Sequence, residues 1–428
     1  MERTYIKDIT PGVRRVQGFV ENFRNKRTMA FIVVKDITGK IQVTVEKEKH
    51  PEMAEELERL TIHSVVTFEG EVVKNDYVKM GGIEMLPERM KIESVADALP
   101  IKEDSDIDCK MDYRWIDLRR DKNQLMMKMQ TVMTAAMREF LVSENFVEIH
   151  TPKLIGAASE SGSDVFEVKY FDTKAYLAQS PQFYKQMAMA SGLERIFETG
   201  PVFRAEKSYT NKHATEFTGF DLEFSYIDSF EDVMALEERL LEYTIRKIKD
   251  AYGEEIKEQF GLEVIVPSLP FPRMKLADVY RELEERYGYK VDDSQKGDLT
   301  TDAERMTKQL ARDMFDHEFL FITDYDAKDR AFYHMRDERG VPQGYDLIFR
   351  GVEITTGAQR EHRYEQLKLQ AEEKGLSRDV DFYLQFFRYG CPPHGGFGIG
   401  IDRLTMLFLG LSIKETEFLF RGPNRLTP

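Results

Sequence analysis

The chain has 428 residues, of which 42 % are hydrophobic and 32 % charged, so we expect a soluble globular protein of two or three domains. The formal net charge of −15 argues against indiscriminate binding of nucleic acid, although a locally basic region could still bind one polyanion. The two cysteines are far apart, which argues against a disulfide framework and a cysteine metal site. No apolar run reaches membrane-spanning length and the charged amino terminus lacks a signal-peptide core, so the sequence predicts a cytoplasmic protein without membrane contact.

The first part of the chain predicts a small β-barrel. Five short β segments are expected at residues 13–20, 30–35, 41–46, 64–73 and 82–91, with a helix at 51–60 between the third and fourth. This order is typical of an OB-fold barrel, which presents basic and aromatic side chains to single-stranded nucleic acid. Residues 1–40 hold nine Lys or Arg against four Asp or Glu, although an ordinary solvated strand face would explain that charge equally well.

The remainder predicts a second, larger domain. We assign residues 1–97 to the barrel, 98–120 to a linker or hinge without sustained periodicity, and 121–428 to the larger domain. Helical spacing at 121–145 leads into a strand that ends at Pro152, and the methionines of that helix are interpreted as core packing. Because a regular β–α–β alternation is missing, we expect an antiparallel sheet with flanking helices, and thus an α+β protein. Its other helices are expected at 230–252, 275–287, 363–374 and from 398 to 408, with strands between 319 and 349.

The most informative stretch is residues 200–206 (GPVFRAE) together with the loop and strand that follow. An arginine reads phosphate through a planar fork of donors, and an aromatic ring offers a stacking surface. Arg204 therefore suits an α-phosphate, His213 the outer phosphates and Phe217 one face of adenine. Taken alone, a short FRAE segment could also be a strand end with a surface ion pair.

Two further segments complete the same predicted nucleotide site. In the second, Glu353 and the hydroxyl of Thr355 or Thr356 could hold Mg²⁺, which prefers carboxylate, hydroxyl and phosphate oxygens. In the third, the glycines of residues 395–400 let the backbone approach a ligand, and Arg403 could cover the other face of adenine. The chain has neither a Walker A motif nor a Rossmann fingerprint, so arginines and a metal ion must handle the phosphates.

Together these segments resemble the three signature motifs of class II aminoacyl-tRNA synthetases. The helix and strand that end at Pro152 resemble motif 1, residues 203–223 resemble motif 2, and residues 398–403 resemble motif 3. The likeness covers nearly the whole chain, and a barrel placed first is typical of the aspartyl, asparaginyl and lysyl subgroup. The chain is similar to its short archaeal and eukaryotic type, without the large bacterial insertion. The resemblance implies an anticodon-binding OB-fold domain, a class II catalytic domain and, through motif 1, a homodimer.

The segment QSPQFYKQ at residues 179–186 resembles the aspartyl-enzyme segment whose lysine contacts the substrate's side-chain carboxylate. Lys185 and Arg360 would then place two cations around one anion, and asparagine would leave those cations without a counter-charge. The resemblance thus implies an aspartate–tRNA ligase, which activates L-aspartate with ATP and loads the 3′ end of tRNA(Asp). Whether tRNA(Asn) is also a substrate stays open.

Three alternatives to this activity remain. An asparaginyl-tRNA synthetase on the same scaffold would be expected to lack Lys185. A catalytically silent RNA-binding paralogue would not need Arg204, Glu353 and Arg403. An ammonia-dependent asparagine synthetase would not need the amino-terminal barrel.

The resemblance assigns the contacts residue by residue. Those implied for aspartate are Glu160, Ser180, Gln182, Lys185, Arg204, Asp221, Thr356 and Arg360. Those implied for ATP are Arg204, Ala205, Glu206, Lys212, His213, Ala214, Phe217, Glu353, Gly400, Ile401, Asp402 and Arg403. Those implied for Mg²⁺ are Glu353, Thr356 and Asp346, and those for the anticodon are Arg24, Phe31 and Gln42. For Phe31 the competing interpretation is an inward residue of the barrel core.

Four positions depart from the usual pattern of the family. Thr356 stands where serine is usual, and Lys212 stands where arginine is usual before His213. Asp402 replaces a glutamate before Arg403, and Gly422 replaces an acid near the carboxyl end. None of these changes removes a group that the expected chemistry requires.

Overall fold

The computed structural model describes residues 1–156, 165–207, 213–376 and 380–428. It divides into two compact units, Met1–Cys109 and Lys110–Pro428. Glu160 and Lys212 lie outside the described residues. Within the described residues, no helix combines the length and the apolar character needed to cross a bilayer.

The first unit is a closed five-stranded barrel, which confirms the predicted OB fold. Strands β1 (Gly12–Asn25), β2 (Met29–Lys35), β3 (Lys40–Glu46), β4 (Val65–Lys74) and β5 (Ile83–Ser94) close in the order β1-β2-β3-β5-β4. Helix α1 (Pro51–Leu57) follows β3 in the chain and precedes β4. Inward residues on alternating positions, such as Ile32 and Val34 on β2, form the core. Gly18 is required where β1 crosses β2, because a Cβ there would lie 2.3 Å from the carbonyl oxygen of Lys35.

The segment expected as a linker contains two short helices, α2 (Ile107–Asp112) and α3 (Arg114–Asp117). Arg114 is fully buried, and its guanidinium donates to Asp117 and to the backbone carbonyls of Glu415 and Glu417. The contacts with Glu415 and Glu417 hold α3 within the second unit. Local periodicity cannot reveal these two contacts, because both residues are about 300 positions away in sequence.

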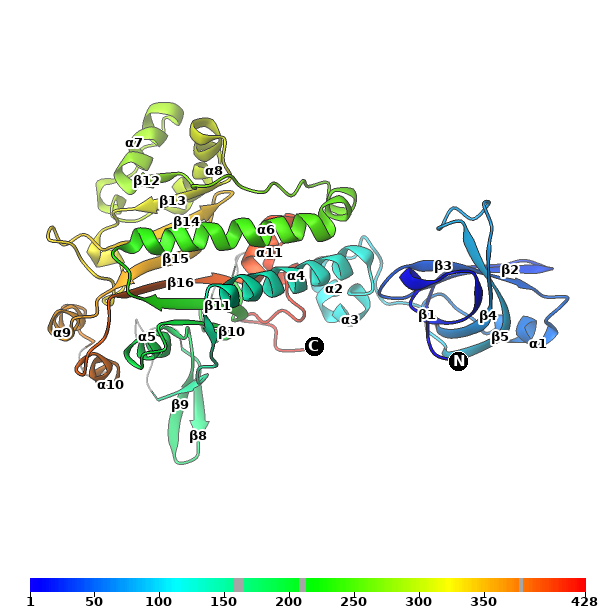
Figure 1. Ribbon diagram of the computed structural model, residues 1–428. Helices are drawn as coiled ribbons and strands as arrows, with labels where there is room; N and C mark the ends of the chain where they lie inside the picture. Colours follow the sequence, from blue (N-terminus) through cyan, green and yellow to red (C-terminus); the bar gives the residue numbers. More distant parts are fainter. Residues whose placement is uncertain (157–164, 208–212, 377–379) are drawn as a thin grey trace. The chain divides into compact units, whose positions relative to one another are not determined.

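The second unit is built on an eight-stranded mixed sheet in the order β12-β13-β14-β15-β16-β11-β10-β6 (Figure 1). The expected antiparallel arrangement holds through its centre, whereas the pairs β12–β13 and β6–β10 are parallel. The expected strand at 146–152 pairs over only two residues. The bounds are β6 Val147–Glu148, β10 Arg195–Phe203, β11 Glu216–Ser225, β12 Arg273–Lys275, β13 Phe319–Thr323, β14 Gly344–Phe349, β15 Val352–Arg360 and β16 His394–Gly400.

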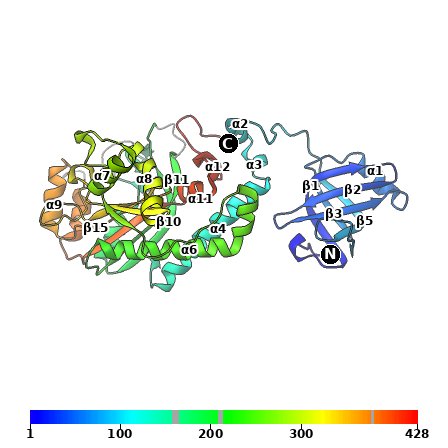
Figure 2. The same cartoon turned by 90° about the horizontal axis from the view of Figure 1, so that it is seen from above.

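Two long helices, α4 (Asp121–Ser143) and α6 (Phe230–Phe260), run side by side along this sheet (Figures 1 and 2). The methionines of α4 at positions 126, 129, 133 and 137 are fully buried in the main core, which confirms their interpretation as packing residues. Helix α6 begins at a capping box formed by Ser229 and Asp232. Helix α6 packs against the sheet in the main core. The hydroxyl of Tyr345 on β14 also donates a hydrogen bond to Glu237 of α6.

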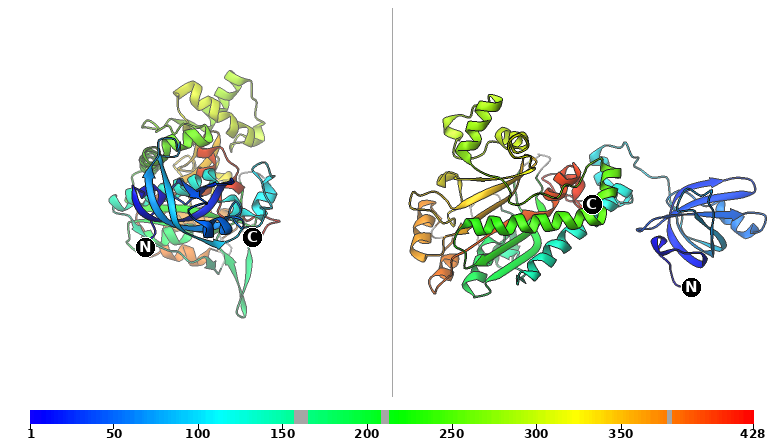
Figure 3. Two further views of the ribbon diagram at one scale, coloured as in Figure 1. Left: turned by 90° about the vertical axis from the view of Figure 1, so that its right-hand side faces the viewer. Right: turned by 45° about the horizontal axis from the view of Figure 1, so that its top comes forward.

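Smaller elements surround the sheet. A three-stranded sheet contains β7 (Leu154–Ile155), β8 (Glu167–Tyr170) and β9 (Thr173–Leu177), and its β8–β9 hairpin projects from the unit (Figures 1 and 3). Helix α8 was not expected from the sequence. The other helices are α5 Gln182–Ala190, α7 Leu276–Tyr287, α8 Thr301–Phe315, α9 Tyr364–Glu373, α10 Asp381–Leu384, α11 Ile401–Leu409 and α12 Ile413–Thr416.

Candidate active site

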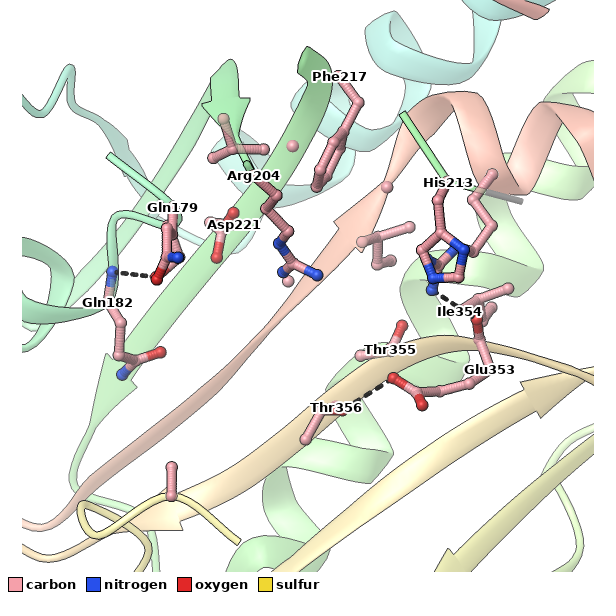
Figure 4. Close-up of a pocket in the computed structure, with 18 of the residues that line it drawn as sticks. Gln179, Gln182, Arg204, His213, Phe217, Asp221, Glu353, Ile354, Thr355 and Thr356 are labelled. Atoms are coloured by element: carbon pink, nitrogen blue, oxygen red, sulfur yellow. Dashed lines mark hydrogen bonds between the residues drawn. The ribbon is translucent and has the colours of Figure 1, made fainter. Parts of the chain in front are cut away.

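A cavity lies over the central strands β11, β15 and β16, and residues from the three predicted segments line it together (Figure 4). The strand order explains their convergence, because β16 pairs with β11 on one side and with β15 on the other. The predicted residues that line the cavity are Ser180, Gln182, Lys185, Arg204, Glu206, His213, Ala214, Phe217, Asp221, Glu353, Thr356, Arg360, Gly400, Asp402 and Arg403. Ala205, Asp346 and Ile401 do not appear in its described lining.

One end of the cavity holds the two predicted cations. Lys185 of α5 is 2 % exposed, and its Nζ lies 3.0 Å from Asp221 Oδ1 and 3.5 Å from Glu223 Oε2. Arg360 of β15, also 2 % exposed, donates from Nε to Glu223 Oε1 at 3.0 Å and from Nη2 to the carbonyl oxygen of Gly396 at 2.8 Å. Glu223 therefore lies between the two cations and contacts both.

Glu223 is a candidate site residue that the sequence analysis missed. It follows Asp221 by two residues on β11, and it is fully buried. Burial by itself would raise the pKa of Glu223, but the charges of Arg360 and Lys185 outweigh this effect and hold the pKa below its ordinary value. The available signal was the alternation in FDLEFS (residues 220–225), which places Glu223 on the same face of the strand as Asp221.

Asp221 occupies its position because the neighbouring strand carries glycine. A Cβ on Gly398 of β16 would lie 2.6 Å from Asp221 Oδ1. The glycine-rich segment thus makes room for a carboxylate of β11 at the cavity wall, next to Lys185. With its second oxygen, Asp221 can accept a hydrogen bond from a cationic group in the cavity.

The other end of the cavity holds the predicted nucleotide contacts. Arg204 follows β10, and its guanidinium lies 5.3 Å from the ring centroid of Phe217 on β11. Figure 4 shows Arg204 reaching between the strands into the cavity. Arg403, in the first turn of α11, donates to the backbone carbonyl of Glu353 at 3.1 Å. Asp402 beside it accepts a hydrogen bond from the backbone N–H of Thr218, so its side chain ties β11 to α11.

The predicted metal ligands lie on β14 and β15. Thr356 Oγ1 is 3.0 Å from Asp346 Oδ1 and 3.1 Å from Glu353 Oε1. Burial and the charge of Asp346 raise the pKa of Glu353 to about 7, and a divalent cation would relieve that repulsion. The carboxylate of Glu353 and the hydroxyl of Thr356 fit Mg²⁺, which takes its other ligands from phosphate and water, whereas both oxygens of Asp346 are already engaged by an arginine. Arg330, which the sequence analysis missed, donates to both oxygens of Asp346 at 2.8 and 2.7 Å.

No group of three or more His, Cys, Asp and Glu side chains suited to a metal occurs within the described residues. An ion that shares its coordination between the protein and nucleotide phosphates is consistent with Glu353 and Thr356.

The pKa of Glu353 predicts a pH-dependent affinity for Mg²⁺. Because the carboxylate must lose its proton to bind the ion, and its pKa is about 7, apparent affinity should rise by about tenfold between pH 6 and pH 8. The measurement is a Mg²⁺ titration of the thermal midpoint at a fixed concentration of ATP. Glu353→Gln is the matched control, because protonation of ATP itself acts on both proteins. An equal pH dependence in this variant would show that Glu353 is not the titrating ligand.

In the barrel, the three predicted anticodon residues share the outward face. Phe31 on β2 is half-buried, lies outside the barrel core and pairs with Arg24 on β1, whose guanidinium is 5.6 Å from the ring centroid. The inward interpretation of Phe31 is therefore wrong. Gln42 on β3 donates from its amide to Glu84 at 3.2 Å. Their contact with an anticodon stays a prediction.

Comparison with known proteins covers both units. The family described as tRNA synthetases class II (D, K and N) matches residues 106–420, and the OB-fold nucleic acid binding domain matches residues 15–93. An aspartate–tRNA(Asp/Asn) ligase of Methanopyrus kandleri is 40 % identical, over 100 % of both chains. One of Aeropyrum pernix is 39 % identical, over 99 % of this chain and 97 % of its own. An aspartate–tRNA(Asp) ligase of Pyrococcus abyssi is 38 % identical, over 97 % and 96 %.

Solved structures agree with this likeness. An asparaginyl-tRNA synthetase from Pyrococcus horikoshii, complexed with asparaginyl-adenylate, superposes with a TM-score of 0.92 at 31 % identity over 100 % of both chains. An aspartyl-tRNA synthetase from Entamoeba histolytica superposes with a TM-score of 0.86 at 28 % identity, over 100 % of this chain and 93 % of its own. The chain belongs to the class II tRNA synthetases (D, K and N), on the branch of the archaeal-type aspartyl-tRNA synthetases.

Proposed function

We propose that this aspartate–tRNA ligase makes aspartyl-adenylate from L-aspartate and ATP in the cavity of Figure 4, and then loads both tRNA(Asp) and tRNA(Asn). The observation that carries the choice of amino acid is the burial of Lys185 and Arg360 at one end of the nucleotide cavity. Support for the two tRNAs comes from relatives at 40 and 39 % identity, which are described as aspartate–tRNA(Asp/Asn) ligases.

Charge explains why such a pocket would prefer aspartate. Before the substrate binds, Lys185 and Arg360 face Glu223 and Asp221, so that two positive charges balance two negative ones. The side-chain carboxylate of aspartate would bind the two cations, while its ammonium would bind Asp221. Asparagine offers a neutral amide to the same cations, so it would forgo the attraction that a side-chain carboxylate gains from two desolvated positive charges.

The first reaction step needs no protein base, because the α-carboxylate of aspartate is already a nucleophile. It attacks the α-phosphorus of ATP in line, a bond to the carboxylate oxygen forms, and pyrophosphate leaves. Arg204 stabilises the charge that develops on the α-phosphate, while Arg403 and Phe217 hold the adenine between them. Mg²⁺ bound by Glu353 and Thr356 would neutralise phosphate charge. In the second step the terminal ribose hydroxyl of tRNA attacks the adenylate carbonyl and AMP leaves.

The deciding experiment offers labelled aspartate or asparagine to the protein with purified tRNA(Asp) or tRNA(Asn). We expect aspartate on both tRNAs and no transfer of asparagine. Activation of asparagine alone would identify an asparaginyl enzyme, and a lack of ATP–pyrophosphate exchange with any amino acid would identify a silent RNA-binding paralogue. Loading of tRNA(Asp) alone would overturn the wider tRNA specificity while leaving the amino acid unchanged.

Phe31→Ala should separate tRNA recognition from amino-acid activation. Loss of one stacked base costs about 1–3 kcal/mol, so kcat/KM for tRNA should fall about 5- to 150-fold. ATP–pyrophosphate exchange without tRNA should stay unchanged, because Phe31 belongs to the barrel. Phe19→Ala on β1 is the control, an exposed barrel aromatic outside the predicted anticodon contacts. Equal losses in both variants would remove Phe31 from the anticodon site.

We also propose that the protein acts in the cytoplasm as a homodimer joined through its motif 1 segment. Strand β6 lies at the edge of the eight-stranded sheet. Apolar side chains on and near it are exposed, among them Val142 at 57 %, Val147 at 47 % and Leu154 at 52 %. Sedimentation equilibrium tests this assembly, and a monomer at micromolar concentration would contradict it.

A further inference from the structure

Behind the amino-acid end of the cavity lies a buried row of polar side chains that the mechanism above does not use. Gln182 and Gln186 are one turn apart on α5, and Gln186 contacts His394 of β16 and Tyr383 of α10. Gln182 is 6 % exposed and the other three are fully buried. Of the four, only Gln182 belongs to the cavity lining that the structure describes.

The direction of every hydrogen bond in this row follows from one backbone carbonyl. His394 Nδ1 lies 2.8 Å from the carbonyl oxygen of Pro392, which can only accept, so Nδ1 carries the proton. Burial lowers the pKa of His394 to about 4, and its ring is therefore neutral near pH 7. A neutral ring protonated at Nδ1 has an Nε2 that can only accept a hydrogen bond.

Gln186 must match this imidazole. Its Nε2 lies 3.0 Å from His394 Nε2 and donates to it. Its Oε1 consequently faces the other way, where it accepts from Gln182 Nε2 at 2.8 Å and from the hydroxyl of Tyr383 at 2.9 Å. Reversing the Gln186 amide would set its oxygen against the acceptor Nε2 of His394 and its NH2 group against the NH2 group of Gln182. In a buried site each polar group left unsatisfied in this way costs about 1–3 kcal/mol.

The same reasoning orients Gln182. Because its Nε2 is committed to Gln186, its Oε1 is the group left to face the cavity, where Asp221 also offers a carboxylate oxygen (Figure 4). An amide oxygen and a carboxylate form an acceptor pair for an ammonium group. A reversed Gln182 amide would instead present N–H donors, which repel a cation.

We propose that Gln186 and His394 are positioning residues that hold the carbonyl oxygen of Gln182 toward the cavity, where it binds the α-ammonium of the amino-acid substrate. This inference rests on the proposed function, since it assigns the acceptor pair to the substrate of that reaction. Neither residue touches the substrate. Their effect passes through the orientation of one amide.

A double-mutant cycle in ATP–pyrophosphate exchange tests this inference. Gln186→Met keeps the side-chain volume and removes the acceptor for Gln182, so KM for aspartate should rise about tenfold, because a hydrogen bond to a charged group is lost. The value of kcat and KM for ATP should stay within about twofold. In a Gln182→Met background, Gln186→Met should cause no further rise, because its effect requires the Gln182 amide.

A second pair of variants keeps the test valid if Gln186→Met does not fold. His394→Leu should raise KM for aspartate about tenfold, whereas His394→Gln offers Gln186 an amide oxygen and should restore KM to within about twofold of the wild type. Thr244→Val is the matched control, because Thr244 is a fully buried polar residue of α6 whose hydroxyl donates to the backbone carbonyl of Leu240 in the same helix. It should lower the thermal midpoint without changing KM for aspartate.

The outcomes separate the two hypotheses. If the wild type shows no aspartate-dependent exchange, the proposed function fails and this inference fails with it. If the wild type is active but the effects of Gln182→Met and Gln186→Met multiply, the two residues act independently and the positioning role alone is wrong. Equal KM values in His394→Leu and His394→Gln would contradict it in the same way.

Discussion

Lys185→Met is expected to lower kcat/KM for aspartate in ATP–pyrophosphate exchange by about a thousandfold. The side-chain carboxylate would keep Arg360 alone as its cation, and removing one partner of a buried ion pair costs about 3–5 kcal/mol. Glu223 would also lose one of the two charges that lower its pKa, and a lower thermal midpoint should accompany the kinetic loss. KM for ATP should change little, because Lys185 contacts Asp221 and Glu223 and none of the predicted phosphate or adenine contacts that the structure describes.

The substrate preference provides a second measurement on the same variant. Without Lys185, aspartate loses a charge partner and asparagine does not. The ratio of kcat/KM for aspartate to kcat/KM for asparagine should therefore fall by about the same factor as kcat/KM for aspartate. Lys153→Met is the control, because Lys153 forms a comparable ion pair with Glu198 at 2.8 Å and does not belong to the described cavity lining. Aspartate kinetics within threefold of the wild type would show that Lys185 is not the recognition lysine.

The barrel could be predicted almost completely from its sequence. Its strands alternate apolar and polar residues, so that the apolar residues face the core and the polar residues face the solvent. Ile32 and Val34 on β2 are two of these core residues. The predicted helix at 121–145 was equally accessible, because its buried methionines repeat at helical spacing. Helix α8 carried comparable signals and was overlooked. Thr300 caps it, and its buried residues include Ala303, Thr307 and Leu310.

The partners inside the site could not be predicted in the same way. Periodicity says which face of a strand is buried, but it does not say which strand lies next to it. Arg360 and Glu223 are 137 positions apart in sequence. They meet because their strands, β15 and β11, flank the same strand, β16. Arg330 meets Asp346 through an irregular segment that no pattern marks. Chemically distinctive residues such as Arg204 were visible from the sequence, whereas the residues that position them depend on tertiary pairing.

Arg204→Ala is the second variant with a large expected effect, and it should act on kcat. Removing a preorganised donor from a charge that develops in the transition state costs about 10²- to 10³-fold in kcat, and KM for aspartate should change much less. Arg204→Lys should recover only a small part of this loss. A lysine keeps the positive charge, but its ammonium group lacks the planar, forked donor geometry of a guanidinium. It would also lose the stacking of the flat guanidinium on the ring of Phe217.

Comparison of these variants with Phe217→Leu identifies the origin of the loss. If the ring matters only by holding Arg204 and adenine in place, Phe217→Leu should raise KM for ATP while kcat falls less than in Arg204→Ala. Rapid-quench measurement of adenylate formation separates the chemical step from product release. A normal rate of adenylate formation in Arg204→Ala would mean that the guanidinium does not stabilise the α-phosphate, and the charge at that step would then have to be met by Arg403 and the groups around Glu353.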